Sequence, residues 1–259
     1  MSLRHRIQFP PTDAQNLDQN EVSFFLLEEN IRREIRFHDY EQIYLRPGLY
    51  EQLFYERLKC SSPAKVGEIL KSTLAGADRS ITELRVLDLG AGNGIMGEVL
   101  KDYGVARLIG ADIIPEAKDA CYRDRPGIYD EYYIADFARL DPDLRGEISG
   151  WSIDCLTCVA ALGFDDIPPP AFFEALSLVE TGGWVAFNIK ETFLDRSDTS
   201  GFSLFVRESI FSEYLDIYHL EKYRHRLSRE GTPLFYFSLV ARKTAEMPDD
   251  FLYRHGIEE

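Results

Sequence analysis

The chain has 259 residues, of which 45% are hydrophobic and 28% are charged, a balance typical of a soluble globular protein. Its formal net charge of −15 disfavours a nucleic-acid partner, because a phosphate backbone would be repelled unless one face were strongly basic. The sequence contains no apolar run of the about 18 residues that a membrane span needs, and no secretion signal. We therefore expect a cytoplasmic protein that does not span a membrane.

The four cysteines support the same compartment. Cys60, Cys121, Cys155 and Cys158 do not form a disulfide framework, so a reducing environment is the simplest one. The last two lie three residues apart on a predicted strand, where their side chains point to opposite faces. Because no second cysteine pair or nearby histidine completes a set of ligands, we expect no metal site.

The first 62 residues are expected to form an N-terminal arm followed by a helical segment. Residues 1–20 are polar and predict an extended arm. In residues 21–37, apolar side chains recur every three or four positions, which predicts a helix. Residues 38–55 are rich in aromatic side chains and are interrupted by Pro47-Gly48, a turn signal.

A helix is predicted over residues 62–76, with Ser62 as its cap and Pro63 at its first position. From Leu84 onwards, short strands alternate with helices. The predicted strands are 85–89, 107–112, 131–135, 152–159, 184–189, 218–227 and 233–242, and the predicted helices are 94–103, 168–179, 203–214 and one that begins near Pro115.

This alternation predicts an α/β fold with a doubly wound, mostly parallel seven-stranded sheet and helices on both faces. The short link between the last two strands makes them an antiparallel C-terminal hairpin. We expect residues 63–245 to form this core, residues 246–259 to form a tail, and the first 62 residues to add an N-terminal helical extension.

The segment 86–94 (VLDLGAGNG) joins the first core strand to its helix. Glycines at such a junction let the backbone approach a ligand closely and adopt positive φ angles. An acidic residue at the strand end, here Asp88, followed by glycines at 90, 92 and 94, resembles the class I (seven-stranded, Rossmann-like) S-adenosylmethionine-dependent methyltransferases. The resemblance implies that this loop wraps the methionine part of the cofactor and that Asp88 helps to fix its amino group, directly or through water.

Further positions fit the same family in order. The resemblance implies that Asp112, at the end of the second core strand, holds the ribose hydroxyls. It implies that Asp136 meets the adenine amino group, that Phe137 covers the ring, and that the fourth strand carries residues near the methyl group. The resemblance covers roughly residues 63–242. The cofactor-binding residues that it implies are Asp88, Gly90, Ala91, Gly92, Asn93, Gly94, Asp112, Ile113, Asp136, Phe137 and Cys158.

A competing motif occupies the same loop. Residues 92–97 satisfy G-x-G-x-x-G, and Asp112 follows Gly92 by 20 residues, which is the dinucleotide fingerprint of NAD(P)-binding oxidoreductases. Asp88 before the motif, Asp136 after it, and the C-terminal hairpin favour the methyltransferase. A non-catalytic module that binds S-adenosylmethionine or a protein partner stays open. So does a purely structural role for the glycines in helix packing and for the later aspartates as caps.

The sequence says less about the methyl acceptor. It lacks the Asn/Asp-Pro-Pro-Tyr/Phe run of many enzymes that methylate exocyclic amino groups of bases, and we expect a small molecule, with a protein as the alternative. The family resemblance implies that residues 21–59 and the insert 191–203 form a lid over the acceptor, although the aromatic N-terminal segment would also suit a dimer surface. Acceptor contacts are expected at His38, Tyr40, Tyr44, Arg46, Tyr50, Lys190 and Glu191. Of these, His38, Tyr44 and Lys190 are the catalytic candidates, and each has packing or surface exposure as its structural alternative.

Overall fold

The structure of the protein is a computed structural model that describes residues 4–10, 22–162, 166–195 and 201–257. Parts of the earlier predictions lie outside the described residues. These are most of the N-terminal arm, the first position of the helix predicted over 21–37, the middle of the insert 191–203 and the last two residues of the tail.

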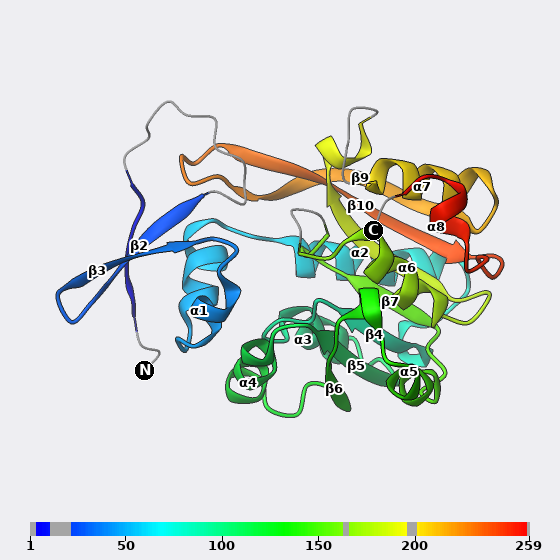
Figure 1. Ribbon diagram of the computed structural model, residues 1–259, viewed down its shortest axis with the longest axis horizontal. Coiled ribbons are helices and arrows are strands. Elements are labelled where there is room, and N and C mark those ends of the chain that lie inside the picture. Colours follow the sequence, from blue (N-terminus) through cyan, green and yellow to red (C-terminus); the bar gives the residue numbers. More distant parts are fainter. Residues whose placement is uncertain (1–3, 11–21, 163–165, 196–200, 258–259) are drawn as a thin grey trace.

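Seven strands form one twisted sheet in the order β6–β5–β4–β7–β8–β10–β9 (Figure 1). All neighbours from β6 to β8 are parallel, and β10 is antiparallel to both β8 and β9. This arrangement confirms the predicted mostly parallel sheet with its antiparallel hairpin. The strands are β4 (Arg85–Leu89), β5 (Arg107–Asp112), β6 (Glu131–Ile134), β7 (Cys155–Cys158), β8 (Trp184–Lys190), β9 (Leu215–Leu227) and β10 (Pro233–Lys243).

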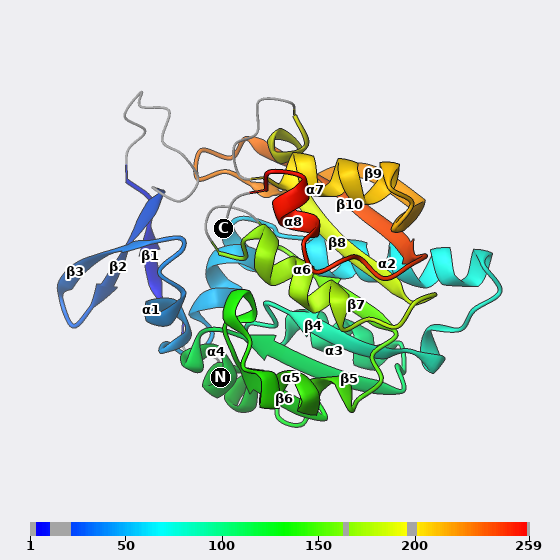
Figure 2. The ribbon, with the colours of Figure 1, turned by 45° about the vertical axis from the view of Figure 1, so that its right-hand side comes forward.

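Helices cover both faces of this sheet (Figure 2). One face packs against α2 (Ser62–Gly76), α3 (Ile95–Asp102) and α4 (Pro115–Asp124). The other packs against α5 (Pro142–Ser149), α6 (Pro169–Ser177), α7 (Phe202–Phe211) and α8 (Phe251–Arg254). Cys155 belongs to the first core and Cys158 to the second, which confirms that they point to opposite faces of β7.

Proline explains where several helices begin. It stands at the first or second position of α2, α4, α5 and α6, where its missing N–H would have had no helical partner. For α2 the boundary differs by one residue from the prediction, because the residue before the helix is Ser61 and Ser62 is its first residue.

The predicted helix over residues 21–37 is wrong. These residues form the hairpin of β2 (Ser23–Glu28) and β3 (Ile31–Arg36), which pairs with β1 (Arg6–Gln8) in a separate three-stranded antiparallel sheet. Glu29 and Asn30 adopt φ angles of 50° and 66°, the left-handed pair that a tight two-residue hairpin turn requires. Phe24 and Leu26 are buried on one face, so the apolar side chains follow the period of a strand.

The N-terminal extension is therefore mixed rather than helical. After the small sheet come α1 (Tyr40–Tyr44) and a π-helical segment, Glu51–Arg57. In Figure 1 the small sheet lies apart from the main sheet, and α1 lies between them, in contact with α4. The far end of the β9–β10 hairpin reaches the same unit, because the Leu227 N–H donates to the Leu58 carbonyl at 2.6 Å.

None of the helices within the described ranges is both long and apolar enough to cross a membrane.

Candidate functional site

A cavity of about 280 Å³ lies at the carboxyl ends of the parallel strands. The sheet order reverses between β4 and β7, and the loops that follow these two strands diverge there and leave a crevice. The floor and walls come from the loops after β4, β5, β6 and β7, and the cover comes from the N-terminal unit. The loop residues that line the cavity are 89–93, 112–114, 135–137 and 159–161.

The glycine loop, residues 90–94, follows β4 and owes its shape to three left-handed residues. Gly90, Gly92 and Gly94 have φ angles of 70°, 54° and 87°, which side chains rarely tolerate. A Cβ added at Gly92 would lie 2.5 Å from the hydroxyl of Tyr44, so no larger residue fits under the cover. Gly92 and its neighbours Gly90, Ala91 and Asn93 line the cavity, as expected.

The next two glycines serve packing. A Cβ at Gly94 would meet the Cys121 sulfur at 2.9 Å, and one at Gly97 would meet the Tyr129 ring at 2.6 Å. Neither glycine lines the cavity. The close approach of the start of α3 to α4 and to the segment after α4 therefore accounts for both, which is the structural alternative that the sequence left open.

Asp88 lies beneath the glycine loop rather than in the cavity. Its two oxygens accept hydrogen bonds from the Tyr129 hydroxyl and the Thr157 hydroxyl, both at 2.7 Å. Burial raises the pKa of this carboxyl to about 6, against the lowering effect of the two hydroxyl donors. In this arrangement Asp88 supports the loop from below.

Asp112 and Asp136 both line the cavity. The Asp112 carboxylate accepts from the backbone N–H of Gly92 at 2.9 Å and from that of Ile114 at 3.0 Å. Asp136 accepts from the Ala138 N–H at 2.9 Å and so caps a short 3₁₀ turn. Because each carboxylate oxygen has two lone pairs, these capping bonds leave capacity for ligand hydroxyl or amino donors.

The loops after β5 and β6 thus offer two carboxylates and one apolar ring. Phe137 is buried and lines the cavity next to Asp136, and Ile113 lines it next to Asp112. Burial raises the pKa of Asp112, while the backbone donors oppose the rise. Two carboxylates for hydroxyl and amino groups, a ring face and a close backbone approach fit the donor set and shape of S-adenosylmethionine.

Several other predicted residues lie away from the cavity. Cys158 is fully buried in one core, and Val159 to Ala161 line the cavity in its place, because β7 ends at Cys158 with that side chain on the core face. Lys190, at the end of β8, is not a lining residue. Glu191 forms an ion pair with Lys222, and Arg46 forms one with Glu28 across the N-terminal unit.

The wall after β7 contains a strained residue that the sequence did not indicate. Ala160 has a φ of 61°, an uncommon conformation for a residue with a Cβ. Its N–H donates to the Asn188 side-chain oxygen at 2.6 Å, and the Asn188 amide donates to the Tyr223 hydroxyl at 2.8 Å. A buried polar network from β8 and β9 therefore holds the cavity wall in an otherwise unfavourable conformation.

The cover is aromatic, as the sequence predicted. Tyr40, Tyr44 and Tyr50 line the cavity, and the rings of Tyr44 and Tyr50 lie 5.2 Å apart between centroids. Burial raises the pKa of Tyr44 well above its ordinary value. Its hydroxyl therefore stays protonated near neutral pH, which suits a hydrogen-bond donor and argues against Tyr44 as a base.

His38 lines the cavity beside Tyr40 and is paired with Asp166, a partner that sequence reasoning missed. The His38 Nδ1 lies 3.0 Å from one Asp166 carboxylate oxygen and 3.1 Å from the other. A carboxylate on Nδ1 favours the tautomer that leaves Nε2 as an acceptor. No pattern links positions 38 and 166, since 128 residues separate them.

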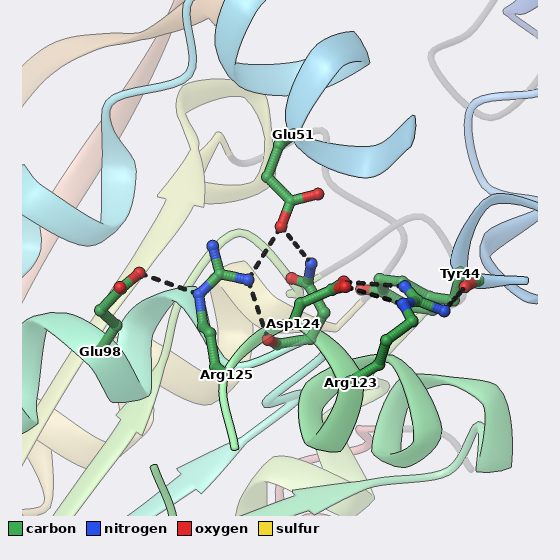
Figure 3. Close-up of polar contacts among 7 residues, drawn as sticks. Tyr44, Glu51, Glu98, Arg123, Asp124 and Arg125 are labelled. Atoms are coloured by element: carbon green, nitrogen blue, oxygen red, sulfur yellow. Dashed lines mark hydrogen bonds and ion pairs between the residues drawn. The ribbon is translucent and has the colours of Figure 1, made fainter. Parts of the chain in front are cut away.

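A charged network joins the N-terminal unit to the glycine loop (Figure 3). Glu51 accepts from the Asn93 amide at 2.7 Å and from Arg125 at 2.8 Å through the same oxygen. Arg125 also donates to Glu98 at 2.9 Å, on the outer side. The other Glu51 oxygen is buried and has no hydrogen-bond partner in the part of the chain that the structure describes. These contacts hold the cover above the loop.

Comparison with known proteins gives one family match. Residues 87–187 match the family model of a methyltransferase domain, and no curated protein matches the chain by sequence. This segment begins in β4 and ends in β8, so it spans all four loops of the cavity.

Solved structures share the fold at low identity. The chain is similar to a proposed RNA methyltransferase from Pyrococcus horikoshii, with 14% identity, a TM-score of 0.50, and coverage of 71% of this chain and 83% of that one. It is similar to a Thermoplasma acidophilum protein with 16% identity, a TM-score of 0.50, and coverage of 79% and 97%. Magnesium protoporphyrin IX methyltransferase from Synechocystis, solved with S-adenosylmethionine, has 14% identity, coverage of 70% and 79%, and a TM-score of 0.49.

Proposed function

We propose that this chain is a class I S-adenosylmethionine-dependent methyltransferase, and that it methylates a small molecule that gives up a proton to His38. The observation that carries the proposal is the His38–Asp166 pair at the wall of a covered cavity. A covered cavity suits a small acceptor better than a folded macromolecule, and a net charge of −15 disfavours a nucleic acid.

The cofactor would be held by groups of the core. Asp112 would accept from the ribose hydroxyls, Asp136 from the adenine amino group, and the backbone of residues 90–93 would follow the methionine part. When bound, the cofactor supplies a methyl group on a sulfonium, which is already an activated electrophile. The tyrosines of the cover exclude water and restrict the directions from which an acceptor can approach.

His38 would act as the general base. A neutral imidazole with Nδ1 on a carboxylate can accept a proton at Nε2, and the carboxylate then stabilises the imidazolium that forms. Asp166 would be the positioning residue, because it touches His38 through Nδ1. A hydroxyl or a phenol needs such a base because it must lose its proton as the new bond to the methyl group forms, and a protonated amine needs one because it must lose a proton before its nitrogen can attack.

The test is an acceptor screen followed by variants. Purified protein is incubated with S-adenosylmethionine and small carboxylates, phenols and amines, and S-adenosylhomocysteine is measured. With the acceptor found, His38→Gln should lower kcat by about 10²- to 10⁴-fold and leave S-adenosylhomocysteine affinity unchanged by calorimetry. His219→Gln, on β9 and outside the cavity lining, is the matched control.

Two outcomes would refute the proposal. Full activity in His38→Gln would show that His38 is not the general base. Methylation of RNA or a protein, with no small molecule accepted, would show that the acceptor is not a small molecule. Asp166→Asn should lower kcat without a change in S-adenosylhomocysteine affinity, because it removes the carboxylate that orients His38 and stabilises its protonated form, and it leaves the cofactor site intact.

A further inference from the structure

A second, smaller chamber of about 40 Å³ adjoins the cavity. The two spaces share lining residues, among them His38, Tyr40 and Asp166, so the chamber adjoins the cavity at the proposed base. The β9–β10 hairpin lines the chamber through His225, Arg226 and Tyr236. A space of this size takes a group of a few atoms rather than a whole substrate.

Arg226 is the unusual member of this lining. Arg226 is only 6% exposed. Its Nη1 donates a hydrogen bond to the backbone carbonyl of Leu227 at 3.0 Å. It forms no ion pair with a carboxylate among the described residues. Its guanidinium carbon lies 5.6 Å from the ring centroid of Phe37, a contact that is favourable but leaves the positive charge in place.

The other titratable groups of the chamber do not neutralise Arg226. Burial raises the pKa of the Tyr40 and Tyr236 hydroxyls and of the Cys60 thiol, and it lowers the pKa of His225. These groups are therefore uncharged near neutral pH. The carboxylate in the lining, Asp166, pairs with His38. A buried guanidinium with no carboxylate partner among the described residues is costly, because it has lost water and has gained no counter-charge there.

A β-bulge turns Arg226 towards the chamber. Along β9, Tyr223 is buried and Arg224 is exposed, so strict alternation would bury His225 and expose Arg226. The pairing with β10 shifts by one residue at this point, between Leu234 and Phe235, which leaves His225 as the extra residue of the strand. As a result His225 and Arg226 are both buried. Bulges next to functional sites commonly re-aim a side chain in this way.

From these observations we infer that the acceptor carries a carboxylate, and that Arg226 binds this carboxylate in the chamber while the atom to be methylated lies beside His38. The inference rests on the proposed function. A planar guanidinium is suited to a carboxylate because it can donate two parallel hydrogen bonds. The aromatic residues between the two spaces, Tyr40 and Tyr50, would then contact the body of the acceptor.

The experiment compares carboxylates with their neutral amides. The protein is first saturated with S-adenosylhomocysteine, and benzoate, benzamide, acetate and acetamide are then titrated by calorimetry. A charged hydrogen-bonded pair predicts at least about tenfold tighter binding of benzoate than of benzamide. Arg226→Met should reduce that ratio to about one, and Arg226→Lys should keep part of it. Arg224→Met, two residues away on the exposed face, is the matched control and should keep the full ratio.

Each result decides the inference. Equal binding of acid and amide by the wild-type protein, or no binding of either, would overturn it without any variant. An undiminished preference in Arg226→Met would overturn it as well. If Arg226→Met does not fold, Arg226→Gln takes its place, with retained S-adenosylhomocysteine affinity as the sign of an intact core. If the wild-type protein does not bind S-adenosylhomocysteine at all, the proposed cofactor site is refuted instead. Failure of the proposed function can therefore be distinguished from failure of the inference about Arg226.

Discussion

The two halves of the cavity are built in different ways. In the half formed by the loops after β4, β5 and β6, the carboxylates have backbone partners close by, as with Asp136 and the Ala138 N–H. In the other half, His38, Asp166 and Arg226 come from three distant segments, and the His38–Asp166 pair spans 128 residues. The first half is shaped by local chain geometry, whereas the second exists only once the N-terminal unit and the hairpin meet. Substitutions in one half should therefore leave the ligand binding of the other half intact, so that it can still be measured.

The largest effect is expected at Gly92, in the first half. Gly92→Arg should abolish binding of S-adenosylhomocysteine, because even a Cβ at this left-handed position would lie 2.5 Å from the Tyr44 hydroxyl. Calorimetry of the folded variant measures this. Gly146→Arg is the control, since a Cβ there meets nothing within 4 Å. Unchanged affinity in Gly92→Arg would show that the ligand does not lie on this loop.

Asp112→Ala should weaken S-adenosylhomocysteine binding by about 10- to 150-fold, the effect of a lost hydrogen bond to a charged group. The carboxylate lines the cavity and also anchors Gly92 and Ile114, so part of the loss would come from a loosened loop. Affinities of the two proteins for S-adenosylhomocysteine provide the measurement. Asp216→Ala, at an exposed position of β9, should bind as the wild type does. A loss below twofold in Asp112→Ala would argue against ribose recognition here.

Asp88 allows a test of the local support beneath the loop. Between the ordinary pKa of 3.8 and the folded value of about 6, the folded chain keeps a proton that the unfolded chain has released. The free energy of unfolding should therefore fall as the pH rises through this interval, by up to about 3 kcal/mol from this group. Urea unfolding of wild type and Asp88→Asn between pH 4 and 7 should show this slope in the wild type alone. Parallel pH profiles would contradict the assignment.

The smallest effect is expected where the two halves meet. Glu51→Gln removes the charge that holds Arg125 and should speed the release of S-adenosylhomocysteine by about two- to fivefold, since the pair is partly exposed. It should also speed amide hydrogen exchange in residues 40–57. Glu98→Gln loses the contact on the outer side of the same arginine and should change neither rate. Equal behaviour of the two variants would mean that this network does not hold the cover.

The first half was also the part that the sequence made predictable. Glycines, prolines at helix starts and short apolar strands identify the core, and the family resemblance that the glycine loop carries implied residues 90–93, Asp112 and Asp136, which do line the cavity. Cys158 was misplaced because β7 ends at that residue and its side chain points into the core. These signals are readable because each depends on residues that are close in sequence.

The second half could not be predicted, because its residues are far apart in the sequence. The apolar spacing in residues 21–37 fits a helix as well as a strand, and only the Glu29-Asn30 turn and its partner strand decide between them. Asp166, Asn188 and Arg226 have no local signature, because their roles depend on contacts between distant segments. The family resemblance, together with the aromatic composition of this segment, did indicate that Tyr40, Tyr44 and Tyr50 would line the cavity from above.

The bulge in β9 has a consequence for how such a protein could diversify. The base of the hairpin is fixed in the main sheet by its pairing with β8, while its far end presents His225 and Arg226. Deleting the extra residue, His225, would restore strict alternation, keep Arg226 inward and remove the imidazole from the chamber lining, without any change in the loops after β4 to β6. A single-codon deletion or insertion is therefore a short mutational route by which one ancestral scaffold could acquire new acceptors.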